Sequence, residues 1–209
     1  MKTLYLLVYQ PMLKRIFLLV ITLFIAFAAR AQSADSVYSQ YLDFNLARLQ
    51  GDQDKILELG ESILPNADKL PEKTRISFYF AAGKMYEDND QPGKALPYYE
   101  KVAVAVPDYY VVHRALGYIY LDKSKQIEKQ IAASAGDKTM TAQLTAAYTS
   151  AVRKALPHLE KAQACDPSDD TLAIIKTLYK NINDAAGLNS LNARLKEQSK
   201  NCIDILTDR

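Results

Sequence analysis

The chain has 209 residues, enough to bury a sizeable core in one domain, and 49% of them are hydrophobic against 24% charged. Its 26 basic and 24 acidic residues give a formal net charge of +2, but residues 1–31 hold four basic residues and no acidic one. The rest of the chain therefore carries 22 basic against 24 acidic residues. This balance removes the electrostatic basis for binding nucleic acid, and no nucleic-acid partner is expected.

Residues 1–31 have the layout of an N-terminal extension followed by an export signal. The basic pair Lys14-Arg15 precedes an uncharged apolar run over 16–29, and an Ala-x-Ala pattern ends at Ala31. An apolar run of fourteen residues is short for a membrane span. The pattern therefore predicts a secretory signal peptide that is cleaved after Ala31.

Two alternatives to this interpretation stay open. The apolar run can remain as an uncleaved N-terminal anchor, and Met12 can be the true start of translation. With cleavage, we expect an exported protein, periplasmic or secreted, with no stable membrane span. Its oligomeric state cannot be read from the sequence.

The first predicted helix pair lies in the stretch "YSQYLDFNLARLQGDQDKILELGESIL". We expect one helix that ends at Gln50, a turn at Gly51-Asp52, a second helix that ends at Leu64, and a linker over 65–71. The apolar positions that keep helical spacing, and are expected to face the core, are Leu42, Leu46, Leu49, Ile56, Leu59 and Ile63.

Two stretches of nine residues nearly coincide, "KALPYYEKV" at Lys94–Val102 and "KALPHLEKA" at Lys154–Ala162, with six identical positions. We expect each to begin the second helix of a repeat, where a proline near the helix N-terminus removes one backbone donor and at most bends the helix. The match extends outward as Tyr79-x2-Ala82-Gly83-x2-Tyr86, Ala95-x3-Tyr99 and Pro107, then as His113-x2-Leu116-Gly117-x2-Tyr120, Ala155-x3-Leu159 and Pro167.

Each residue type in this pattern has a physical reason. Glycine and alanine let a neighbouring helix approach closely, aromatic rings fill wider gaps, and a terminal proline cannot continue a helix. These positions are Gly83, Gly117, Ala95 and Ala155, then Tyr86, Tyr99 and Tyr120, then Pro107 and Pro167.

The pattern resembles the tetratricopeptide (TPR) repeat, a helix-turn-helix of thirty-four residues, with Ala82 in place of leucine and Tyr79 in place of tryptophan. The resemblance implies an all-α fold, a right-handed solenoid of about four antiparallel helix pairs over 35–206. Approximate repeats cover 36–64, 76–109, 110–169 and 170–206. In this family the first helices of successive repeats line a concave groove. By resemblance, the groove-facing positions here are Phe80, Lys84, Glu87, Arg114, Tyr118 and Leu121.

The third repeat is expanded, because 50 positions separate Gly117 from Pro167 whereas 24 separate Gly83 from Pro107. The 26 extra residues are rich in helix formers and break only near Gly136. They predict two lengthened antiparallel helices and an arm of about 20 Å beyond the repeat stack. The alternative is an arm that packs back on the domain. The pairs expected to face each other are Leu116 and Ala155, Tyr120 and Ala151, Ile127 and Leu144, and Ile131 and Met140.

The last predicted pair, 170–206, is expected to cap the stack with a more polar outer face. A break over Asn183–Gly187 separates its two helices. The apolar positions at helical spacing are Leu172, Ile175, Leu178 and Tyr179, then Leu188, Leu191 and Leu195.

The sequence contains no arrangement of residues that indicates catalysis, a metal or a cofactor. His113 and His158 stand at aromatic positions of the repeat, which favours packing, and the Asp166–Asp170 stretch suits helix capping. Cys165 and Cys202 lack a positioned base in the sequence. Export allows them to form a disulfide, and two separate thiols are the alternative.

These observations predict a non-catalytic interaction or scaffold module of a Gram-negative cell envelope. It would bind another envelope protein or peptide through the concave groove and the arm. Tyrosine is abundant, with 14 residues, and exposed tyrosines suit protein recognition. The alternative function is a carrier or sensor of a small ligand or glycan that uses a tyrosine-rich concavity.

Overall fold

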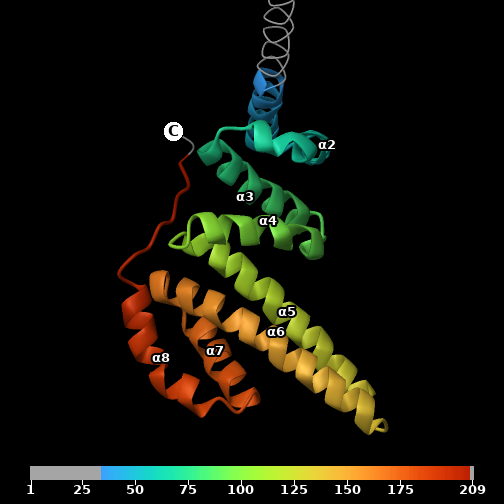
Figure 1. The fold of residues 1–209 in the computed structure, drawn as a ribbon, viewed down its shortest axis with the longest axis vertical. Coiled ribbons are helices and arrows are strands. Elements are labelled where there is room, and N and C mark those ends of the chain that lie inside the picture. The colour runs from blue at the N-terminus through green and yellow to red at the C-terminus, as the bar shows by residue number, and fades with distance from the viewer. Residues whose placement is uncertain (1–33, 208–209) are drawn as a thin grey trace, which may run out of the picture. The chain divides into compact units, whose positions relative to one another are not determined.

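The computed structural model describes residues 34–207 (Figure 1). The predicted signal peptide and its cleavage point lie outside these residues. The described part of the chain is all-α, as predicted: it consists of helices, short connections and an extended tail. Within it, no helix is both long and apolar enough to cross a bilayer.

The chain divides into two compact units, of which the first ends at Pro71 and the second begins at Glu72. The sequence predicts one domain over 35–206, so this division differs from the expectation. The boundary between the two units lies at the end of the predicted linker, residues 65–71. Each unit is described by itself.

The first unit contains a helix over 34–50, helix α2 (Gln53–Ile63) and the short 3-10 helix η1 (Leu64–Lys69). Gly51 turns the chain with a φ of +73°, a conformation that favours glycine. The Asp52 side chain then accepts a hydrogen bond from the Lys55 amide and caps α2. The two predicted helices are confirmed, while most of the predicted linker is the 3-10 helix.

The predicted core face of the first helix is wrong. Leu42 and Leu46 are each 52% exposed, and Leu49 is 86% exposed. The helix carries two apolar stripes, and the one that contains two aromatic rings is buried, since larger side chains gain more from burial. Its buried residues are Val37, Tyr41, Phe44 and Ala47.

The second unit begins with α3 (Glu72–Asp88) and α4 (Pro92–Ala105), which pack against each other. A Cβ atom added at Gly83 would lie 2.5 Å from the ring of Tyr99, which is fully buried. Pro107 follows the end of α4. The close approach at this glycine and the helix end before this proline are both as predicted.

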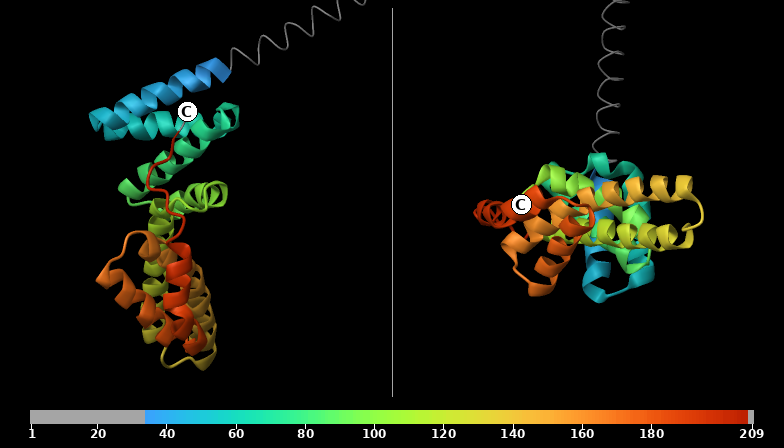
Figure 2. Two further views of the ribbon diagram at one scale, coloured as in Figure 1. Left: turned by 90° about the vertical axis from the view of Figure 1, so that its left-hand side faces the viewer. Right: turned by 90° about the horizontal axis from the view of Figure 1, so that it is seen from below.

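The lengthened hairpin consists of α5 (Tyr110–Ala133) and α6 (Lys138–Cys165), joined at a turn over 134–136. The Asp137 side chain caps α6 by accepting hydrogen bonds from the Thr139 and Met140 amides at 2.9 Å. The two helices lie side by side, and their far ends extend past the other helices of the unit (Figure 2). We call residues 122–149 the arm.

The prediction for the second "KALP" stretch is wrong. Helix α6 begins at Lys138, so Pro157 lies deep inside the helix rather than near its N-terminus. The arm lengthens this helix at its N-terminal end, so the repeat segment lies in its C-terminal half. Pro157 and its counterpart in α4, Pro97, are both exposed, so water can bond the carbonyl that each proline leaves free.

Helices α7 (Asp169–Asn181) and α8 (Ala185–Gln198) pack against α6 and against each other. Glu160 of α6 is 2% exposed and binds both of them. Its carboxylate accepts two hydrogen bonds from the Arg194 guanidinium, at 2.7 and 2.8 Å, and one from the Tyr179 hydroxyl. A buried carboxylate is stable only with such partners, so this cluster fixes the two helices on α6.

Residues 199–207 follow α8 as a turn and then an extended segment, and we call them the strap. The Lys161 ammonium, on a residue only 7% exposed, lies 2.5 Å from the Asn201 carbonyl oxygen and 2.8 Å from an Asp108 carboxylate oxygen. An isolated parallel bridge joins Ile203 to the α4–α5 connection. There the Ile203 amide donates to the Asp108 carbonyl at 2.8 Å, and the Tyr110 amide donates to the Ile203 carbonyl at 3.1 Å.

Cys165 and Cys202 form a disulfide, with their Cα atoms 5.6 Å apart. The sequence allowed this disulfide but did not exclude the alternative of two separate thiols. The bond joins the end of α6 to the strap across 37 residues. In the chain-entropy treatment, a loop of this length stabilises the fold by about 4 kcal/mol.

The contact between Gly83 and Tyr99 is testable by Gly83→Ala. We expect this variant to lose about 1–2 kcal/mol of unfolding free energy, because overpacking costs about 1–3 kcal/mol and improved helix propensity returns up to about 1 kcal/mol. Gly93→Ala is the matched control, since it also lies in a helix but has no atom within 4 Å of its added Cβ. Urea denaturation followed by circular dichroism would contradict this account if Gly83→Ala were as stable as Gly93→Ala.

Candidate functional site

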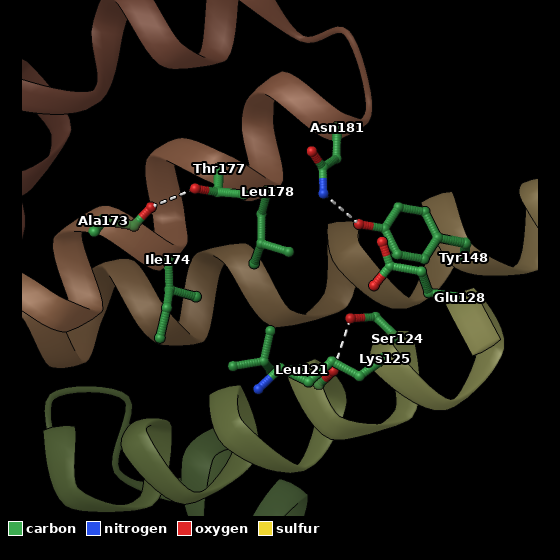
Figure 3. A pocket seen from close by; sticks show the side chains of 10 residues that line it. All are labelled: Leu121, Ser124, Lys125, Glu128, Tyr148, Ala173, Ile174, Thr177, Leu178 and Asn181. Carbon is green, nitrogen blue, oxygen red and sulfur yellow. Dashed lines mark hydrogen bonds between the residues drawn. The ribbon is translucent and has the colours of Figure 1, made fainter.

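A pocket of about 270 Å³ lies between α5, α6 and α7 (Figure 3). Leu121 projects into it from α5, while Ile174 and Leu178 project from α7. These three side chains give the pocket an apolar wall on both sides. The remaining lining residues are Ser124, Lys125, Glu128, Tyr148, Ala173, Thr177 and Asn181.

The polar groups inside this pocket are largely satisfied by the protein itself. Ser124 donates its hydroxyl proton to the Leu121 carbonyl at 2.7 Å, and Thr177 donates to the Ala173 carbonyl at 2.9 Å. The Asn181 amide donates to the Tyr148 hydroxyl at 2.9 Å. A guest in the pocket would therefore meet mostly apolar surface.

Two opposite charges belong to the same pocket. Lys125 and Glu128 are both exposed, and neither forms an ion pair with another residue of the described part of the chain. Their charged groups are available to a partner.

A second pocket, of about 360 Å³, borders a different face of α5. It combines three carboxylates with the ring of Tyr118, and its lining residues are Glu87, Asp90, Pro92, Tyr118, Ile119 and Asp122. Glu87 accepts a hydrogen bond from the Tyr99 hydroxyl at 2.7 Å. Burial, followed by this bond, raises the pKa of Tyr99 above its ordinary value.

Three of the six predicted groove residues line these pockets. Glu87 and Tyr118 border the acidic pocket, and Leu121 borders the apolar one. The Tyr118 hydroxyl also lies 3.1 Å from the Thr171 hydroxyl, which links α5 to α7.

The other three predicted residues line neither pocket, and each contacts other residues of the chain. The partners are Tyr99 and Tyr109 for Phe80, Asp88 for Lys84, and Tyr110 and Asp166 for Arg114. These contacts are ring packing for Phe80, ion pairing for Lys84, and both for Arg114.

The tyrosines of α3 and α4 form a stack of three rings. Tyr98 lies between Tyr79 and Tyr86, with ring centroids 6.0 and 5.8 Å apart. The Lys101 ammonium lies 4.6 Å from the Tyr79 centroid, and the Lys94 ammonium lies 5.3 Å from that of Tyr86. Ring faces that are used in this way are poorly placed to stack on a sugar or another flat ligand.

His113 and His158 face each other across α5 and α6, with their Nδ1 atoms 2.9 Å apart. The ring of Tyr120 stacks on His158 with an interplanar angle of 6°. Burial, followed by the charge of His113, lowers the pKa of His158 to about 4. Burial also lowers the pKa of His113. The pair packs in its neutral form, in agreement with the predicted packing role.

Within residues 34–207, no cluster of three or more His, Cys, Asp or Glu side chains is arranged to hold a metal ion. The two sulfurs of Cys165 and Cys202 are joined to each other, so neither is a free nucleophile in this state. Comparisons with protein-family models, with curated proteins and with solved structures return no match. The tetratricopeptide resemblance therefore stays a prediction from the repeat residues.

Sequence reasoning missed most of the apolar pocket. Its α7 side comes from Ala173, Ile174 and Thr177, which the repeat pattern does not include. Leu178 was noted in the sequence only for its helical spacing, and it is 5% exposed. The spacing of 173, 174, 177 and 178 along one helix face is the signal that could have grouped these residues.

The histidine pair predicts a dependence of stability on pH. Both folded pKa values lie below the ordinary 6.5, so the unfolded chain binds more protons as the pH falls from about 7 to about 4. We expect this pair to cost on the order of 1–3 kcal/mol of unfolding free energy across that range, after allowance for solvent screening.

The variant His158→Phe keeps a ring beside Tyr120 and removes one titrating group. Urea denaturation at several pH values should give it a shallower loss of stability on acidification than the parent protein. Equal slopes for the two proteins would rule out the histidine pair as the cause.

Proposed function

We propose that this chain is an exported, non-catalytic protein-interaction module with a tetratricopeptide-like right-handed solenoid. Its partner is another envelope protein, held by the pockets along α5 and by the arm. The repeat residues support the solenoid, because Gly83 and Gly117 both lie at close helix contacts with Tyr99 and Leu159. Export is supported by the layout of residues 1–31.

The observation that carries the proposal is the apolar pocket between α5, α6 and α7. Its volume is about 270 Å³, close to the lower end of the range of roughly 300–1,000 Å³ that is usual for small-molecule sites. It suits an apolar side chain of a partner protein, with Lys125 and Glu128 available to pair with charges that flank this side chain. Apolar anchors surrounded by polar contacts are the usual arrangement of protein interfaces.

The arm offers a second contact surface. Helix α6 carries no charged residue between Lys138 and Arg153, although Ala142, Ala146 and Ser150 are exposed in this stretch. Surfaces without charge are favoured at the centre of protein interfaces. This stretch would let a partner helix approach closely.

Three matched substitutions test this function. Ala173→Arg places a long charged side chain in the apolar pocket, and Ala142→Arg places one on the arm. Ala186→Arg places one on an exposed position of α8 that lines neither pocket and does not belong to the arm. Each tagged variant would be used to capture partners from an envelope extract, followed by quantitative mass spectrometry.

We expect Ala173→Arg to reduce recovery of the specific partner at least about tenfold, because the long side chain fills the space that an apolar side chain of the partner would occupy, and its charge would lose water on binding. Ala142→Arg should also reduce recovery, and Ala186→Arg should leave it unchanged. Equal recovery by all three variants would contradict the proposal for both surfaces. Circular dichroism spectra of the variants check that each is folded.

A further inference from the structure

The strap is held by one covalent bond and by few other contacts. The disulfide fixes Cys202 to the end of α6, and Lys161 and the bridge at Ile203 hold the residues on either side. Asp204, Ile205 and Thr207 are exposed, and Ile205 is 69% exposed. Without the disulfide, a few hydrogen bonds must oppose the conformational entropy of the whole segment.

The strap begins directly after a residue with an unsatisfied polar atom. The side-chain oxygen of Gln198, the last residue of α8, is buried and has no hydrogen-bond partner among the described residues. An unpaired buried oxygen is unfavourable, so local opening at this end of α8 would let water bond it.

The two cysteines differ in exposure. Cys202 is exposed while Cys165 is half-buried, which favours attack by an external thiolate on the Cys202 sulfur. Cys165 then leaves as the thiolate. Lys161 lies one helical turn before Cys165 on α6, and its ammonium already reaches the strap backbone beside Cys202. A cation near the leaving sulfur stabilises the thiolate and makes it a better leaving group.

We propose that the strap is a redox latch, which an external dithiol opens by reducing Cys165–Cys202 while the helices stay folded. The first thiolate of the dithiol attacks Cys202, forms a mixed disulfide and releases Cys165, which then takes up a proton. The second thiol of the dithiol displaces Cys202. The dithiol becomes a disulfide, the protein gains two thiols, and the strap leaves the α4–α5 connection.

The helices keep their own contacts when the latch opens. The cluster of Glu160, Tyr179 and Arg194 does not involve the disulfide, and Ile175 and Leu191 are buried in the same region. The body of the second unit therefore has reasons to remain folded after reduction. This inference stands independently of the proposed partner binding.

Amide hydrogen exchange of the full exported chain, before and after dithiothreitol, tests the latch. The reporters are the Ile203 and Tyr110 amides, because the hydrogen bonds that these two amides donate form the bridge between the strap and the α4–α5 connection. We expect their exchange to accelerate at least about tenfold after reduction, while the amides in the middle of α6 change less than about threefold. Titration of two free thiols confirms that reduction is complete.

Three results would overturn the proposal. These are unchanged exchange at Ile203 and Tyr110 after full reduction, equal acceleration of all helices, and resistance of the disulfide to dithiothreitol in the native protein. The double variant Cys165→Ser, Cys202→Ser should match the reduced protein in the same measurement. With glutathione, a monothiol, mass spectrometry should find the mixed disulfide on Cys202, and an adduct on Cys165 would overturn the proposed order of attack.

Discussion

Two consecutive buried charges on α6, Glu160 and Lys161, organise the C-terminal part of the second unit. They are 2% and 7% exposed, and buried charges are stable only with partners of opposite charge or strong hydrogen bonds. Glu160 finds its partners on α7 and α8, whereas Lys161 finds carbonyl groups at the end of α8 and in the strap. The segments that follow α6 are therefore placed by electrostatics as well as by apolar burial.

Helix α6 also forms one side of the arm, so its two halves have different surroundings. Its C-terminal half is buried among α5, α7 and α8, and its N-terminal half is mostly exposed in the arm. At the boundary between them, Tyr148 bonds Asn181 of α7 and closes one end of the apolar pocket. The pocket thus lies where the arm leaves the body, and a partner seated there would be within reach of both surfaces.

The parts of the fold that the sequence predicts are those where one residue type has one physical role. Gly83 beside Tyr99 and Pro107 after α4 are such cases, because a missing side chain or a missing amide proton acts locally. The first helix was predicted, but its buried face was not, since two apolar stripes compete and only packing against other elements decides between them.

The candidate site was harder to predict than the fold. Of the positions that the repeat predicts for a groove, Leu121, Glu87 and Tyr118 line a pocket, while Phe80 and Arg114 contact neighbouring rings and charges. The clusters around Glu160 and Lys161 involve residues 15 to 53 positions apart, and nothing local in the sequence links them. The disulfide was allowed by the cysteine count alone, because proximity of the two thiols depends on how α8 returns along α6.

The disulfide closes a covalent loop that contains α7, α8 and the turn between them, because it joins Cys165 to Cys202. A single cut of the backbone inside this loop, for example in the exposed turn at Asn183, would leave two fragments that are still joined through the sulfurs. Proteolysis of this turn would therefore leave no separated fragment in a denaturing gel until the disulfide is reduced.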